Sequence, residues 1–361
     1  MIITEEQKSL KVRTLKQLAA ALGVSRTTVS NAFNRPDQLS DALRNQILEA
    51  AREFGYAGPN PVARKLRTGR AGAVGVLFGG SLPYAFTDPA AIAFLRGVAQ
   101  ICEQNHSGVL ILPVVNEPDA GRMIREAVVD GFVTYCLPDE SPVIPCVLER
   151  GLPVTMVEQS PIAGVNSIEI DDTGGAYTAA RHLLMLGHRQ FAILSLDLRP
   201  DGRSGRVSAA RRSQIQYALT ANRLTGFETA FREAGLKAAM PVIECPHNDR
   251  GLAREFTAKL LKGKSPPTAI LTMSDELALG ALQAAGDCGI PVPESLSIVG
   301  FDDIPLASQV RPALTTVRQP LAEKGRLAVE ILFKQKSATE ELEHHRLETS
   351  LVVRESTGPI R

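Results

Sequence analysis

The chain has 361 residues, is 44% hydrophobic, and carries 40 Lys and Arg against 39 Asp and Glu. This length is enough for more than one core and predicts two or three domains, which excludes a single small module. Residues 1–70 hold twelve basic and six acidic side chains, so a basic head precedes a slightly acidic remainder. That asymmetry is typical of a small polyanion-binding segment attached to a larger domain.

Cysteine and histidine usage argues against a metal or redox protein. The five cysteines are scattered without a C-x-x-C pair and the six histidines lack metal-site spacing, so we expect no metal, disulfide framework or cofactor. The first residues are polar and of mixed charge, and no run of about 18 apolar residues occurs anywhere. The sequence therefore predicts a cytoplasmic protein that does not enter a membrane.

Residues 12–58 predict three short helices with a common core. The first covers 15–22, with Thr14 as its N-cap, and Gly23 supplies the turn that follows it. Ser25 caps a second helix, whose inward side chains are Val29 and either Ala32 or Phe33. The third helix follows Ser40 and buries Leu43, Ile47, Leu48 and Ala51.

This arrangement predicts a helix-turn-helix, in which the second helix enters the major groove of DNA. Arg26 can grip guanine and Asn31 adenine, and the hydroxyls of Ser25, Thr28 and Ser30 suit phosphate oxygens. The candidate DNA-binding residues of the head are Thr14, Ser25, Arg26, Thr27, Thr28, Ser30, Asn31 and Asn34. The alternative is a three-helix bundle with an ordinary polar face.

Residues 59–71 form a proline-punctuated basic stretch, which predicts a linker or hinge. Its segment VARKL can form one or two helical turns when held against another surface. Leu66 then has two interpretations, a wedge for the minor groove or a stray surface leucine.

Behind the hinge, short apolar runs such as AVGVLF, QFAILSL and SIVGF alternate with longer helical patterns such as AIAFLRGVAQICEQN. Alternation of this kind predicts parallel sheets covered on both faces, with a ligand crevice at the carboxyl ends of the strands. A Rossmann-type enzyme is the rival interpretation. The sequence lacks G-x-G-x-x-G after the first strand, a P-loop and G-x-S-x-G, so we expect no catalytic residues.

Several stretches together resemble the lactose-repressor (LacI) family of bacterial regulators. They include TLKQLAAALGVSRTTVSNAFN at 14–34, NPVARKLRTG at 60–69, RLTGF at 223–227, SDELALGAL at 274–282 and PESLSIVGFDD at 293–303. The resemblance spans nearly all of residues 12–355. Asn31 departs from it, because the family more often has arginine or histidine there.

The resemblance implies a homodimeric repressor whose hinge helices fold on a pseudo-palindromic double-stranded operator, with Ala63 and Leu66 as hinge contacts. It also implies a disordered extension over 1–11, a head over 12–58 and a hinge over 59–71. A ligand-binding and dimerisation domain over 72–357 follows, with two Rossmann-like lobes similar to periplasmic binding proteins. The expected lobes are 72–164 with 304–318, and 165–303 with 319–357, joined by three connections.

The resemblance places a small-molecule effector, a sugar or related metabolite, between the lobes. Arg223 and Asp302 are the strongest candidate contacts, although they could instead form an interlobe ion pair. Tyr84 and Phe86 could stack on a ring or belong to the core, and Asp275 could cap a helix. The effector candidates are Tyr84, Phe86, Glu158, Arg223, His247, Ser274 and Asp302.

One stretch departs from the family pattern. Residues 197–227 are longer than the usual connection before RLTGF and are rich in arginine. They could bring cations over an anionic effector or present a solvated surface.

The leading hypothesis is an effector-controlled repressor, and the alternative is a metabolic enzyme or sugar-binding protein with a basic appendage. No leucine-heptad tail follows residue 352, so we expect a dimer.

Overall fold

A computed structural model of the chain describes residue 12 and residues 14–58, 70–114, 117–236, 240–335 and 342–360. The chain divides into two compact units, Met1–Ala71 and Gly72–Arg361. Ala63, Leu66 and the predicted extension over 1–11 lie outside the described residues. No helix within the described ranges is long and apolar enough to cross a membrane.

The described part of the first unit is helical. Side chains start its helices: Thr14 and Gln17 form a capping box, and the Ser25 hydroxyl accepts a hydrogen bond from the Thr28 amide. Gly23, with φ of 65°, adopts the left-handed conformation that ends the first helix. The elements are α2 (Leu15–Leu22), α3 (Arg26–Asn34), η1 (Pro36–Gln38) and α4 (Asp41–Glu53).

The core of the head follows helical spacing. Val29 and Ala32 of α3 are buried, as predicted, and Phe33 packs edge-on against Tyr56 at 5.8 Å between ring centroids. Leu48 was expected inside α4 but is half-buried, and Ala50 takes its place in the core. The reason is that the buried face of α4 follows positions 47, 50, 51 and, at the helix end, 54, so position 48 lies at the margin of this face.

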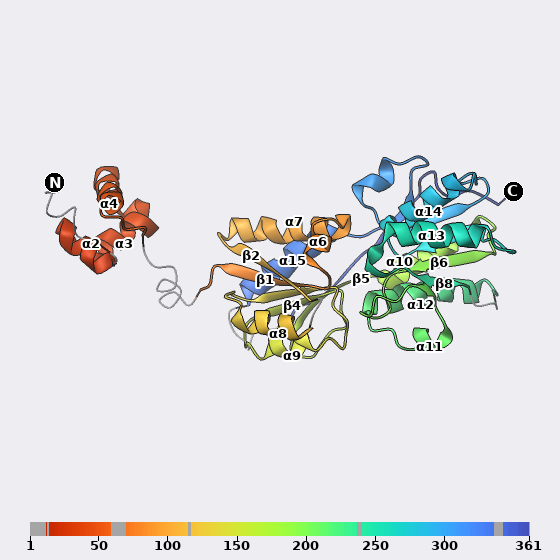
Figure 1. The fold of residues 1–361 in the computed structure, drawn as a ribbon, viewed down its shortest axis with the longest axis horizontal. Coiled ribbons are helices and arrows are strands. Elements are labelled where there is room, and N and C mark those ends of the chain that lie inside the picture. The colour runs from red at the N-terminus through yellow and green to blue at the C-terminus, as the bar shows by residue number, and fades with distance from the viewer. Residues whose placement is uncertain are drawn as a thin grey trace. The chain divides into compact units, whose positions relative to one another are not determined.

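The second unit has two lobes, each with a twisted sheet between two layers of helices (Figure 1). The described strands of the first lobe form a parallel sheet in the order β12-β5-β4-β3-β1-β2. Its elements are β1 (Ala73–Phe78), α6 (Leu82–Ala85), α7 (Pro89–Gln104), β2 (Gly108–Pro113), α8 (Glu117–Glu126), β3 (Phe132–Tyr135), α9 (Val143–Leu148), β4 (Val154–Val157), β5 (Asn166–Ile170), α15 (Leu321–Lys334) and β12 (His344–Leu347).

The described strands of the second lobe form a sheet in the order β13-β11-β10-β9-β6-β8-β7. It is parallel except at β13 and β7, which pair antiparallel at its two edges. Its elements are α10 (Asp172–Met185), β6 (Phe191–Ser195), β7 (Gly205–Arg206), α11 (Ala209–Arg212), α12 (Ala218–Glu233), β8 (Val242–Glu244), η2 (Pro246–Asn248), α13 (Arg250–Leu261), β9 (Ala269–Thr272), α14 (Asp275–Asp287), β10 (Ser297–Asp302), η3 (Pro305–Ser308), β11 (Thr315–Arg318) and β13 (Ser350–Val352).

Each face of each sheet has its own core. Apolar side chains of α7 and α15 cover one face of the first sheet, and those of α8 and α9 cover the other. In the second lobe, α10 and α12 cover one face, whereas α13 and α14 cover the opposite face. The alternating strand and helix pattern of the sequence therefore produces the predicted pair of three-layered lobes.

The predicted assignment of chain segments to the lobes is wrong at the carboxyl end. The segment 304–318 belongs to the second lobe, because β11 pairs with β10 from Val299↔Thr315 onward. The described residues of 321–347 belong instead to the first lobe, where α15 packs on α7 and β12 pairs with β5. These pairings join strands far apart in the chain, and short apolar runs do not specify which sheet they enter.

The described chain crosses between the sheets at three places. It crosses after β5, between β11 and α15, and between β12 and β13. The predicted number of connections is thus found, and one of them lies at the expected boundary between 318 and 319. The first crossing follows β5 and not residue 164, and the crossing expected after residue 303 is replaced by one after β12.

The α7–α15 contact depends on glycine. An added Cβ at Gly325 would overlap the carbonyl oxygen of Phe94, and one at Gly97 would overlap that of Ala322. We predict that Gly325→Ala destabilises the protein by about 1–3 kcal/mol, because the packed backbones cannot separate without loss of contacts. Gly286→Ala in α14 is the matched control, since its Cβ would meet no atom within 4 Å. Chemical denaturation measures both variants, and equal stability would show that the helices can move apart.

Candidate functional site

In the head, the first turn of α3 presents Arg26 and Thr27 to solvent. Ser25 and Thr28 are engaged with each other, since the Ser25 hydroxyl lies 2.8 Å from the Thr28 hydroxyl and 3.0 Å from its amide nitrogen. The Thr14 hydroxyl likewise caps α2 by accepting from the Gln17 amide at 3.2 Å. These hydroxyls therefore stabilise the helix starts that hold Arg26 in its exposed position.

The remaining candidates of α3 are less exposed. Ser30, Asn31 and Asn34 are half-buried. The Asn34 amide donates to the carbonyl oxygen of Ser30 at 2.9 Å, so it folds back on its own helix. Among the described residues of the head, Arg26 and Thr27 are thus the most accessible of the predicted base-reading side chains.

In the second unit, a cavity of about 400 Å³ lies between the two lobes. Residues at the carboxyl ends of strands line it, including Phe78 of β1, Tyr135 of β3 and Asp302 of β10. This is the position expected of a ligand crevice in an open parallel sheet. Of the predicted effector contacts, those that line the cavity are Tyr84, Glu158, Arg223, His247, Ser274 and Asp302.

Phe86 does not line the cavity. It caps the carboxyl end of the short helix α6 and is 63% exposed, whereas Tyr84 in the same helix packs against Phe78 at 5.9 Å between ring centroids. Side chains two positions apart on a helix point about 200° apart, which is why Tyr84 faces the cavity and Phe86 faces away from it.

Arg223 and Asp302 both line the cavity, as expected, and they do not form the alternative ion pair with each other, because each has another partner. Arg223 is 2% exposed, donates from Nε to Asp172 Oδ1 at 2.7 Å and lies 3.7 Å from the centroid of the Phe301 ring. Asp302 Oδ1 accepts from Gln319 Nε2 at 2.5 Å. Burial raises the pKa of Asp302 to about 7, and Arg223 limits the rise.

A buried lysine, missed by the sequence analysis, lies beside these residues. Lys324 of α15 is fully buried, and its Nζ donates to Glu158 Oε1 and to Gln319 Oε1, both at 2.5 Å. Burial alone would raise the pKa of Glu158, but the charges of Lys324 and Arg223 lower it. The signal was present, because Lys324 interrupts the apolar stripe formed by Leu321, Ala328 and Ile331.

Backbone strain gathers around this cavity. Five cavity-lining residues other than glycine have positive φ, between 51° and 121°: Cys136, Glu158, His247, Asn248 and Asp302. Such conformations cost about 1–3 kcal/mol each and persist only where surrounding contacts enforce them. Their concentration here indicates a binding site, since they direct side chains at the strand ends into the cavity.

Asn248 joins the lobes at the cavity rim. Its Nδ2 donates to Asp88 Oδ1 of the first lobe at 2.9 Å, and its Oδ1 accepts from the Ser274 hydroxyl. Ser274 is also the N-cap of α14, the role proposed for Asp275. Asp275 is instead fully buried, where it accepts from the Ile304 amide and the Thr316 hydroxyl.

The arginine-rich segment contributes an acidic and aromatic wall to the cavity. Asp197, Pro200 and Tyr217 of this segment line the cavity, whereas its arginines before Arg223 do not. The segment therefore does not bring the predicted cations over the cavity. Across the described residues, no group of three or more His, Cys, Asp and Glu side chains could hold a metal ion.

Comparison with known proteins gives consistent results for both units. Residues 14–60 match the family of bacterial regulatory proteins described as lacI, and residues 180–357 match the periplasmic binding protein-like domain. The HTH-type transcriptional regulator Rv3575c of Mycobacterium tuberculosis is 40% identical over 96% of this chain and 97% of its own length.

Two solved structures have the same fold. A LacI-family transcriptional regulator from Corynebacterium glutamicum superimposes with a TM-score of 0.73 and 35% identity, covering 96% of this chain and 98% of that one. The complex of the transcriptional regulator CelR with cellobiose has a TM-score of 0.68 and 26% identity, covering 96% and 100%.

The raised pKa of Asp302 predicts a pH-dependent stability. Between the unfolded pKa near ~4 and the folded value of about 7, the folded chain binds a proton that the unfolded chain releases. Stability should therefore fall as the pH rises from about 5 to about 7, and Asp302→Asn should flatten this slope. Denaturation at several pH values measures it, with the exposed Asp119→Asn as control. The control should keep the slope of the parent protein, and a slope that is equally steep in Asp302→Asn would contradict this assignment.

Proposed function

Because the chain belongs to the lacI family of bacterial regulatory proteins and is a helix-turn-helix transcriptional regulator, we propose that it is a repressor controlled by an effector in the interlobe cavity. The observation that carries the proposal is the cavity itself, with buried charged side chains and strained backbone at the strand ends. Such a regulator acts on DNA in the cytoplasm and performs no catalysis.

The effector is a sugar or a related neutral, hydroxylated metabolite. Four carboxylates line the cavity, those of Asp88, Glu158, Asp197 and Asp302, and they suit hydroxyl donors better than a phosphate or acid. Tyr84, Tyr135 and Tyr217 add aromatic surface of the kind that packs against sugar rings. The related regulator CelR, whose structure contains cellobiose, is consistent with this class.

The head reads a pseudo-palindromic operator in double-stranded DNA. Arg26 makes the base-specific contact, Thr27 supports it, and the hydroxyls at the helix starts orient the head on phosphates. Ala63 and Leu66 remain predicted hinge contacts, with Leu66 as a wedge in the minor groove. The hinge would link operator binding to the lobes.

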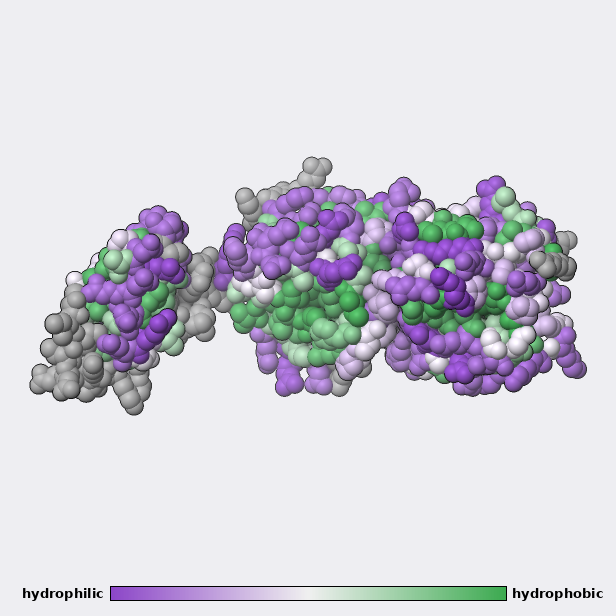
Figure 2. Space-filling view, turned by 90° about the horizontal axis from the view of Figure 1, so that it is seen from above, coloured by the Kyte–Doolittle hydropathy of each residue, from purple (hydrophilic) through white to green (hydrophobic). Residues whose placement is uncertain are grey.

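Two copies form the active homodimer, as a two-half-site operator requires. The first lobe carries exposed apolar side chains, among them Ile92, Val109 and Leu110, and β2 is the edge strand of its sheet. Figure 2 shows apolar residues gathered on one face of this lobe. Exposed apolar edges are normally covered, and a second copy is the occupant that the operator geometry demands.

Effector control requires only that the ligand bind two lobe arrangements unequally. A coupling of about 1–3 kcal/mol changes operator affinity by a factor of about 5 to 150. The alternative function, an enzyme or sugar-binding protein with a basic appendage, is not favoured by the family to which the chain belongs.

A thermal-shift screen tests the effector class. Neutral sugars and polyols are compared with sugar phosphates and organic acids, since a ligand at about 100 times its Kd adds about 2.7 kcal/mol of stability. A hit that also changes operator affinity supports the proposal. Stabilisation by anionic compounds alone would contradict the neutral effector.

Arg26→Ala should reduce operator discrimination more than general DNA affinity. A bidentate guanine contact contributes about 1–3 kcal/mol of specificity, whereas phosphate contacts are independent of sequence. Competition between operator and random duplex at fixed salt measures the ratio. If the ratio is the same as in the parent protein, Arg26 does not read a base.

Tyr84→Ala should weaken effector binding at least about tenfold, equivalent to about 1.4 kcal/mol, because it removes an aromatic wall of the cavity. Phe86→Ala is the matched control, an aromatic residue two positions away that does not line the cavity. Calorimetric titration with the effector found in the screen compares the two. Equal losses in both variants would place the ligand elsewhere.

A further inference from the structure

The connection between β6 and α12, residues 196–217, is unusually long for a strand-to-helix loop. It contains the short strand β7 and the one-turn helix α11. It also supplies Asp197, Pro200 and Tyr217 to the cavity wall. We call residues 197–217 the strap, because each of its two ends is attached to a different part of the second unit.

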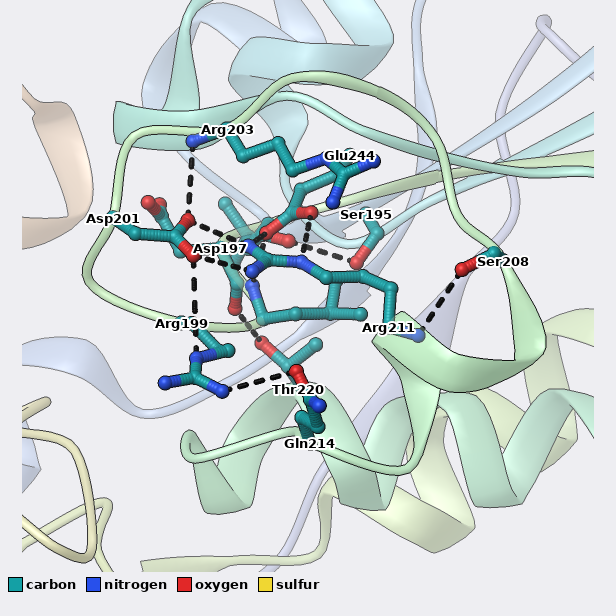
Figure 3. A network of polar contacts seen from close by, with 12 residues as sticks. Ser195, Asp197, Arg199, Asp201, Arg203, Ser208, Arg211, Gln214, Thr220 and Glu244 are labelled. Atoms are coloured by element: carbon teal, nitrogen blue, oxygen red, sulfur yellow. Dashed lines mark hydrogen bonds and ion pairs between the residues drawn. The ribbon is translucent and has the colours of Figure 1, made fainter.

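Arg211 of α11 anchors the strap to the sheet of the second lobe (Figure 3). Its side chain is 5% exposed and reaches two carboxylates at once. Toward Glu244 of β8, Nε donates to Oε2 at 3.0 Å and Nη2 donates to Oε1 at 2.8 Å. Toward Asp201, Nη2 donates to Oδ1 at 2.8 Å and Nη1 to Oδ2 at 2.5 Å. A guanidinium in this doubly bidentate arrangement is held in position and direction.

The same carboxylates hold the beginning of the strap. Glu244 Oε1 also accepts from the Leu198 amide at 2.7 Å, next to the cavity residue Asp197. Asp201 Oδ1 accepts from the Arg203 amide at 3.2 Å. Arg211 therefore connects the strap's start, its middle helix and strand β8. Its pair with Glu244 is buried, whereas Asp201 is half exposed, so releasing Arg211 would leave the buried Glu244 charge unpaired.

The far end of the strap contacts the first lobe. The Gln216 carbonyl oxygen accepts from the Asp139 amide at 2.8 Å, and Gln216 Nε2 donates to Glu140 Oε2 at 3.1 Å. Asp139 and Glu140 belong to the loop after β3 of the first lobe. The Gln216 amide in turn donates to the Leu198 carbonyl oxygen at 2.8 Å, so the two ends of the strap are tied together.

Two further arginines of the strap, Arg199 and Arg212, also contact protein groups. Arg199 Nη1 donates to Gln214 Oε1 at 3.0 Å, and Arg212 forms an ion pair with Glu228. These guanidiniums stabilise the strap and are not oriented to bind an anionic ligand. Contacts within the protein thus account for Arg199, Arg211 and Arg212, whereas Arg203 and Arg206 are exposed.

We propose that Arg211 is a positioning residue for effector binding: without touching the ligand, it holds the strap as a cavity wall and as a bridge to the first lobe. This inference rests on the proposed effector site. Loosening Arg211 frees Tyr217 and Asp197 from their places and releases the Gln216–Asp139 bond. Effector affinity then falls, because binding must supply the free energy that orders the strap as a wall of the cavity.

Amide hydrogen exchange of the full chain tests the strap without any ligand. In Arg211→Lys, the amides of Leu198, Gln216 and Asp139 should exchange at least about tenfold faster, while those of β6 keep the parent rate. Arg206→Lys, at an exposed position of the same strap, is the matched control. Parent-like protection of all three amides in Arg211→Lys would overturn the proposal.

A second variant separates positioning from mere stability. The double substitution Arg211→Met with Glu244→Gln removes both buried charges at similar volume, so it should keep the thermal midpoint near that of the parent. It should still lose the protection of the Leu198 and Asp139 amides. If the double variant melts like the parent and retains this protection, Arg211 is not what positions the strap.

The binding arm uses cellobiose, D-ribose and D-glucose as probes in calorimetric titration. For any of these that binds the parent, Arg211→Lys should raise Kd at least about tenfold, whereas Arg206→Lys should change it less than about twofold. Undiminished affinity in Arg211→Lys would overturn the proposal. If none binds the parent, these three sugars are not the effector, and the exchange measurement alone decides the role of Arg211, independently of the proposed effector class.

Discussion

The second unit depends on the burial of Lys324. An ammonium group without solvent contact is tolerated only where carboxylate and amide oxygens accept its hydrogen bonds, and Glu158 and Gln319 provide such oxygens. Gln319 lies in the crossing between β11 and α15, and it also donates to Asp302 at the end of β10. One lysine thus links the first lobe, the crossing segment and the second lobe through directional bonds. Removing one partner of such a cluster costs about 3–5 kcal/mol, so the hinge region has one favoured arrangement.

The cavity is built on that cluster. Glu158, bonded to Lys324, and Asp302, bonded to Gln319, both have positive φ and both line the cavity. Their backbone strain and the desolvation of their carboxylates oppose folding, while the apolar cores on both faces of each sheet favour it. A ligand hydroxyl that donates to these carboxylates gives them one more hydrogen bond, beside those they already accept from Lys324 and Gln319. The cavity between the two lobes is therefore a specific binding site because polar side chains on strained backbone point into it from several strand ends.

Local signals allowed the sequence to predict the head well and the lobes only in outline. Thr14, Ser25 and Gly23 act within four residues of themselves, so the helices they bound could be read directly. The lobe to which β11 or α15 belongs depends instead on pairing with strands and helices far away in the chain, which no local pattern encodes. Arg211 looked like a ligand-facing charge because its buried partner, Glu244, lies 33 residues farther along the chain, in β8. Lys324 was readable in principle, as a charge within an apolar stripe.

The small number of bonds between the lobe rims makes regulation by a small ligand energetically reasonable. At the rim, the described contacts include Asn248 with Asp88 and Gln216 with Asp139 and Glu140. Each such hydrogen bond contributes about 0.5–1.5 kcal/mol net, so opening the rim costs only a few kcal/mol while the hinge cluster stays intact. An effector that makes one or two more hydrogen bonds in one lobe arrangement than in the other supplies a free energy of the same size. Its total affinity is irrelevant to this shift, since only the difference in affinity between the two arrangements changes their populations.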